Sequence, residues 1–152
     1  TADKPKKKYW MLVECVDLDS KDLKPYNSQK IPDYTRKIEM VIDFKPDEKN
    51  VTRGFINNAT HKIDVKYPTL NKVYDGITEF DADQVAFIIE KEEIIDIILI
   101  SGNETTPDYN NLNTIDPIER DTTTIPADGW TILRFVADNP GVWGFHCHIE
   151  VI

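Results

Sequence analysis

Residues 130–149 read WTILRFVADNPGVWGFHCHI, and this stretch decides the fold. Two runs rich in β-branched and aromatic residues, 130–137 and 142–149, lie on either side of the sequence DNPG at 138–141. Asp, Asn, Pro and Gly are the residues that tight turns favour. The pattern therefore predicts two adjacent antiparallel strands joined by this turn.

Other parts of the chain repeat this succession of strand-like runs and turn residues. In residues 37–44 every second residue is apolar, which predicts a strand with one buried face. Further strands are predicted at 62–66, 85–90 and 94–100, with loops at 17–33 and 101–117. Many short strands separated by turns are typical of an all-β Greek-key sandwich or barrel, here a single domain spanning 1–152.

The composition and net charge of the chain argue against a nucleic-acid partner and against a membrane-spanning helix. The chain has 152 residues, 40% of them hydrophobic and 30% charged, as a folded globular domain has. Its net charge of -9 would repel phosphates, so we expect no nucleic-acid partner. The most apolar run, 94–100, contains Asp96 and is far shorter than the roughly 20 residues of a membrane-spanning helix. We expect no such helix.

Glycosylation sequons point to a secretory, extracytoplasmic origin. Asn-x-Thr sequons begin at Asn50, Asn58 and Asn103, which predicts a glycoprotein. The sequence also begins at Thr1 without a leader, as expected of a mature chain or of a piece of a longer one. Cys15 and Cys147 could form a disulfide, but no spacing rule requires it.

The run 142–149 contains the residues suited to chemistry. If it forms a strand, successive side chains point to opposite faces. Cys147 then faces the core together with its aromatic neighbours, while His146 and His148 face away. A thiolate in an apolar setting suits copper, and the two imidazoles can each reach a metal. Considered alone, however, such a Cys is more often a plain core residue, and a His-x-His pair more often a solvated one.

The neighbouring residues extend the motif. Arg120-Asp121-Thr122 and the runs 125–135, 137–143 and 145–150 together closely resemble the end of the C-terminal, third domain of fungal-type multicopper oxidases, the laccases and ferroxidases. The resemblance covers about 53–150. Residues 1–50 match less specifically and fit an interdomain segment.

This resemblance implies a cupredoxin-type fold and copper as cofactor. It implies that Cys147 is the ligand of the blue type 1 copper, and that His146 and His148 bind the type 3 pair of the trinuclear cluster. It also implies one-electron oxidation of a small phenolic substrate or of Fe(II), coupled to reduction of dioxygen to water. The partners of such a domain are the remaining cupredoxin domains of the oxidoreductase.

The chain departs from the family pattern in its copper ligands. The stretch 98–119 contains no histidine, where the family has a histidine-rich strand, and Ile152 stands where a type 1 histidine is expected. The axial ligand position would lie further on. We therefore expect no oxidase activity, and no blue copper site, from this chain alone. Two alternatives stay open: a non-enzymatic cupredoxin-like scaffold, and a weak Cu(II)- or Zn(II)-binding module using His146 and His148, with Glu150 as a further candidate ligand.

Overall fold

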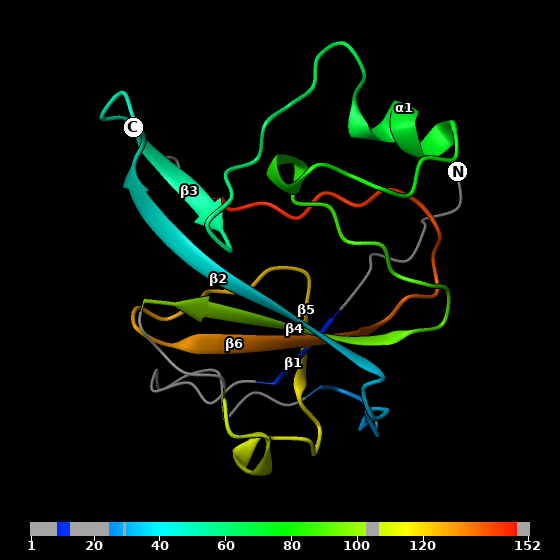
Figure 1. The fold of residues 1–152 in the computed structure, drawn as a ribbon. Helices are drawn as coiled ribbons and strands as arrows, with labels where there is room; N and C mark the ends of the chain where they lie inside the picture. Colours follow the sequence, from blue (N-terminus) through cyan, green and yellow to red (C-terminus); the bar gives the residue numbers. More distant parts are fainter. Residues whose placement is uncertain (1–8, 13–24, 29, 103–106, 149–152) are drawn as a thin grey trace.

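The computed structural model describes residues 9–12, 25–28, 30–102 and 107–148. Within this part of the chain, strands dominate and form one six-stranded sheet in the order β3-β2-β4-β6-β1-β5 (Figure 1). The strands are β1 (Tyr9–Leu12), β2 (Arg36–Pro46), β3 (Thr52–Ile56), β4 (Ile94–Ser101), β5 (Ile118–Arg120) and β6 (Trp130–Val136). The all-β prediction is confirmed.

Short helical turns occupy the connections. They are α1 (Thr69–Tyr74), η1 (Ala82–Gln84) and η2 (Tyr109–Asn111). In Figure 1 the segment with α1 lies above the sheet and η2 lies below it. β2 and β4 run parallel, whereas the other neighbouring strands are antiparallel. No helix in the described part of the chain is both long and apolar enough to cross a bilayer.

The centre of the sheet is buried on both faces. β4 is a nearly continuous run of Ile and Leu, as strands covered on both sides are. One face packs Ile95, Ile97 and Leu99 of β4 against β2 and β6. The other packs Ile98 and Ile100 against Ile31 and Ile132. The core therefore consists of two layers that share β4.

The prediction of a half-buried strand at 37–44 is confirmed by β2. Ile38 and Met40 are buried, and Ile42 packs against the same cluster. Phe44, the fourth residue of the predicted face, is instead largely exposed. The end of β2 pairs only with β3, so it extends beyond the core.

Three predicted strands are wrong, two of them for local reasons. In 62–66 the carboxylate of Asp64 accepts hydrogen bonds from the backbone N–H groups of Lys66 and Tyr67, which folds the chain into a turn. In 85–90, Val85 ends η1 with φ of 45°, a left-handed conformation that no strand tolerates. Further along that run, Arg36 donates to the backbone oxygen of Ile88, in place of a strand partner.

The predicted hairpin of 130–137 and 142–149 is also wrong. The first run forms β6, but 142–148 is not a strand, and 149 lies outside the described residues. The reason is topological, because β6 pairs with β4 on one side and with β1 on the other. Both of its edges are occupied, so the following run finds no place beside it.

The predicted loops agree with the structure where it describes them. Residues 25–28 and 30–33 contain an isolated bridge, Lys30 to Ile115, but no strand. Residues 107–117 contain η2 and are otherwise irregular. Cys15, and with it the suggested disulfide to Cys147, lies outside the described residues.

Candidate metal centre

The His146-Cys147-His148 motif lies on an exposed segment rather than within the sheet. Residues 141–148 leave β6 after the turn, and every one of them is exposed. Figure 1 shows this segment, coloured orange to red, on the side of the sheet where α1 lies. The turn itself is closed by the indole Nε1 of Trp143, which donates to the backbone oxygen of Asn139 at 3.1 Å. This hydrogen bond fixes the start of the segment. Beyond it, residues 141–148 do not pair with β6 as a strand.

The two histidines lie side by side. Their ring centroids are 4.7 Å apart with the planes inclined at 49°. A ring nitrogen of His146, Nδ1, lies 3.4 Å from the backbone oxygen of Cys147. Both histidines are exposed, in agreement with the prediction that they face away from the core. Two imidazoles at this separation can reach one metal ion from the same side.

The prediction that Cys147 faces the core is wrong, because Cys147 is exposed. The prediction assumed a pleated strand, in which Cys147 would point opposite to the histidines. Without a neighbouring strand the pleat is lost, and its aromatic neighbours Trp143 and Phe145 are themselves 57% and 48% exposed. The apolar cage that would favour a copper–thiolate bond is therefore missing in this arrangement.

The ligand set does not fit a complete copper site. Within the described ranges, no three or more His, Cys, Asp or Glu side chains are grouped so that they could hold a metal ion. The third histidine, His61, is placed elsewhere, with Nδ1 3.0 Å from the backbone oxygen of Gln84. A blue copper site needs two His and one Cys in a plane, so His146 and His148 form at most part of a site. Glu150 and Ile152 lie outside the described residues.

A second polar group, which sequence reasoning missed, lies at the centre of the sheet. Asp96 and Arg134 face each other on β4 and β6 and are 0% and 4% exposed. Arg134 donates from Nε to Oδ1 at 2.6 Å, from Nη2 to Oδ2 at 2.8 Å, and from Nη1 to the backbone oxygen of Pro32 at 3.0 Å. Burial acts to lower the pKa of Arg134, but its hydrogen bonds with Asp96 and the charge of that carboxylate raise it. This fork-shaped pair of hydrogen bonds holds two strands and a loop together.

Aromatic residues cover this buried pair. The guanidinium of Arg134 lies 5.3 Å from the ring centroid of Tyr34, and Lys37 Nζ lies 3.6 Å from that of Tyr109. The hydroxyl of Tyr109 is buried without a well-formed hydrogen bond. That burial, together with the nearby Asp96 carboxylate, raises the pKa of Tyr109 well above its usual range. A signal was present in the sequence. Each of the apolar runs 94–100 and 130–137 contains one charged residue, Asp96 and Arg134, and the two charges have opposite signs.

The chain is similar to multicopper oxidases over most of its length. The sequence model described as multicopper oxidase matches residues 43–152. Laccase-4 of Arabidopsis thaliana is 55% identical over 51 residues, which cover 33% of this chain and 9% of that protein. The iron transport multicopper oxidase FET3 of Saccharomyces cerevisiae is 30% identical over 193 residues, covering 99% of this chain and 29% of that protein. The aligned stretch is longer than this chain, so the yeast protein has residues there without a counterpart.

Solved structures give the same picture of the fold. The crystal structure of Fet3p, described as a multicopper oxidase that functions in iron import, has a TM-score of 0.71 and 28% identity, and covers 97% of this chain and 35% of that one. The laccase of Botrytis aclada has a TM-score of 0.67 at 20% identity, over 82% of this chain and 27% of that one, which supports the fold alone. The predicted cupredoxin-type fold is confirmed. The chain spans less than a third of the length of these curated relatives.

Proposed function

The chain belongs to the multicopper oxidase family, and we propose that it acts as one domain of a larger laccase- or ferroxidase-type enzyme and does not oxidise substrate by itself. One observation carries this proposal. The centre of the sheet is buried and its Asp96 and Arg134 are hydrogen-bonded to each other, whereas the motif of copper-ligand type is exposed and lacks further ligands within the described residues.

The family implies copper, and His146, Cys147 and His148 are the proposed ligands within this chain. Further ligands of the trinuclear cluster would come from other domains of the enzyme, packed against the exposed segment 141–148, whereas this chain has no histidine at 98–119 or at 152 for the type 1 copper. For Cys147 to take part, its thiol would have to turn from solvent toward the metal. The complete enzyme would oxidise a phenol or Fe(II) and reduce dioxygen to water. The three sequons support a secreted or extracytoplasmic location.

A weak Cu(II)- or Zn(II)-binding module is the second candidate function. The observation that favours it is the 4.7 Å separation of the His146 and His148 rings, which lets both imidazoles face one ion without any partner domain. Two protein ligands leave most of the coordination sphere to water, so the affinity would be low. If the two histidines bound no metal at all, the chain would act as a non-enzymatic cupredoxin-like scaffold.

Dioxygen uptake and copper binding by the purified chain test the proposal together. With Cu(II) added, we expect no dioxygen consumption with a phenol or with Fe(II), and only a weak d–d absorption band. The band should disappear in the variant His146→Ala/His148→Ala and persist in His61→Ala, the matched control. Dioxygen consumption that depends on His146 and His148 would overturn the proposal, as would an intense copper–thiolate band.

A further inference from the structure

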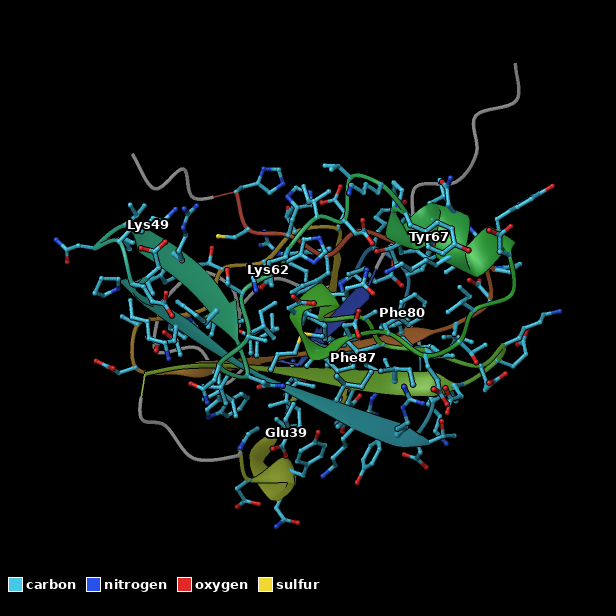
Figure 2. All side chains as sticks on the ribbon, turned by 45° about the horizontal axis from the view of Figure 1, so that its top comes forward. Glu39, Lys49, Lys62, Tyr67, Phe80 and Phe87 are labelled. Atoms are coloured by element: carbon cyan, nitrogen blue, oxygen red, sulfur yellow. The ribbon has the colours of Figure 1, made fainter. Side chains whose placement is uncertain are left out.

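The β2–β3 hairpin forms one open edge of the sheet. β3 is the last strand on this side and pairs only with β2 among the described strands. Figure 2 shows Lys49 at the far end of this hairpin, beyond the body of the molecule. Phe44 and Val51 on the hairpin are each 45% exposed. An open edge strand with exposed apolar side chains beside it is a template for pairing with other chains, so natural proteins cover or blunt such edges.

Two Asn-x-Thr sequons lie at the two ends of β3. Asn50 precedes the strand, in the turn closed by the hydrogen bond from Asp47 N–H to the Val51 backbone oxygen. Asn58 follows it, in the turn closed between Ile56 and Ala59. Both asparagines are exposed and have positive φ, of 59° and 64°. Asparagine tolerates this left-handed conformation, which is common in turns.

The amide nitrogens of these two residues are available for a new bond. The turn at Asn50 is stabilised by the carboxylate of Asp47, which accepts from the N–H groups of Lys49 and Val51, and not by the Asn50 side chain. Asn58 uses only its oxygen, Oδ1, which accepts from Lys45 Nζ at 3.0 Å. In both residues Nδ2 makes no hydrogen bond with the described part of the chain.

The neighbouring Asn57 provides an internal contrast. Its Oδ1 accepts from Val41 N–H at 2.8 Å, and its Nδ2 donates to the backbone oxygen of Glu39 at 2.9 Å. It is a structural residue that holds the end of β3 to β2, and it is not part of a sequon. Asn57 therefore supports the hairpin through both ends of its side-chain amide, whereas Asn50 and Asn58 leave Nδ2 without a hydrogen bond to the described residues.

We infer that Asn50 and Asn58 are N-glycosylation sites and that their glycans cover the open edge at β3. The transfer uses a lipid-linked oligosaccharyl diphosphate as donor. A bond forms between Nδ2 and the anomeric carbon, the glycosyl–phosphate bond breaks, the diphosphate departs and Nδ2 gives up one proton. The hydroxyls of Thr52 and Thr60 complete the acceptor sequences. This inference rests on the secretory location proposed above, but not on any copper chemistry.

Secretion of the whole chain from a eukaryotic host tests the modification. Every chain tested carries Asn103→Gln, so that glycans can be attached only at the two sequons of the hairpin. We expect glycopeptides at both Asn50 and Asn58. Thr52→Ala should abolish the glycan at Asn50 although Asn50 itself remains, whereas Thr52→Ser should retain it. Thr60→Ala and Thr60→Ser are the matched pair for Asn58. A translocated chain, recognised by removal of its added leader, that carries unmodified Asn50 and Asn58 would overturn the inference.

Light scattering tests the role of the glycans. We expect the secreted, glycosylated chain to stay monomeric, and the Thr52→Ala/Thr60→Ala chain to form higher-mass species as its concentration rises. Equal monomer content for the two chains would contradict edge protection. Neither readout involves copper or dioxygen, so failure here and failure of the proposed oxidase role are distinguishable.

Discussion

Polar side chains are buried and hydrogen-bonded at the centre of the sheet, but they are exposed in residues 141–148, the segment that follows β6. At the centre, Asp96 and Arg134 are buried, and each charged oxygen and nitrogen of the pair has a partner. In 141–148, by contrast, the polar side chains are exposed and stand beside aromatic groups that are half exposed. The two regions are only a few residues apart in sequence. Their difference teaches that the polar groups at the centre of the sheet find their partners within this chain, while the motif suited to metal chemistry lacks further ligands within the described residues.

The largest expected effect comes from breaking the buried pair. Arg134→Leu leaves the Asp96 carboxylate unpaired in the interior, which costs about 3–5 kcal/mol of unfolding free energy. Arg53→Leu is the control, because it removes the exposed ion pair with Asp47, and we expect a much smaller loss from it. Denaturant unfolding of the purified chains measures both. A loss below about 1 kcal/mol for Arg134→Leu would mean that the centre is not closed as described.

Truncating apolar side chains sharpens the contrast between the two regions. Ile132→Ala creates a cavity under a residue that is 0% exposed, and we expect a loss of about 2–5 kcal/mol. Phe145→Ala removes a larger side chain that is 48% exposed, and we expect a loss of about 1 kcal/mol. The smaller residue should thus matter more. The reverse order in denaturant unfolding would place Phe145 in the core and restore the predicted strand.

A smaller effect is expected from pH. The pKa of Tyr109 is raised by burial and by Asp96, so the folded chain keeps this phenol protonated where the unfolded chain ionises it. Stability from this group is complete below the unfolded pKa of about 10 and is lost as pH rises above it. We expect Tyr109→Phe to change stability by less than about 1 kcal/mol at neutral pH, because the hydroxyl has no good partner.

Above pH of about 10, the Tyr109→Phe variant should lose less stability than the unmodified chain. Tyr74→Phe is the control, since Tyr74 is 90% exposed. Denaturant unfolding at a series of alkaline pH values gives the comparison. Parallel pH profiles for Tyr109→Phe and the unmodified chain would show that the phenol is not buried beside Asp96.

The sequence predicts those strands whose residues are apolar enough to be buried whichever strands lie beside them. The runs 94–100 and 130–137 are apolar enough to require the interior, and they became β4 and β6. Alternation in 142–149 specified two faces but could not specify a partner strand, because pairing depends on which edges are already occupied. The edges of β6 are taken by β1 and β4, and the expected hairpin did not form.

The candidate site shows the same limit. Placing His146 and His148 together followed from their spacing, and the structure agrees. The orientation of Cys147 depended on a pleat that exists only within a sheet, and there the prediction failed. The pairing of Asp96 with Arg134 depends on the register of β4 against β6, which no local pattern gives.

Amide hydrogen exchange, followed by mass spectrometry on the whole chain, tests the contrast most directly. Peptides from β4 and β6 should be strongly protected, because these strands are hydrogen-bonded to neighbours on both sides and buried. The peptide covering 142–148 should exchange far faster, because it is exposed and belongs to no strand. Protection of 142–148 equal to that of β6 would contradict the account, since it would place the His146-Cys147-His148 motif within the sheet after all.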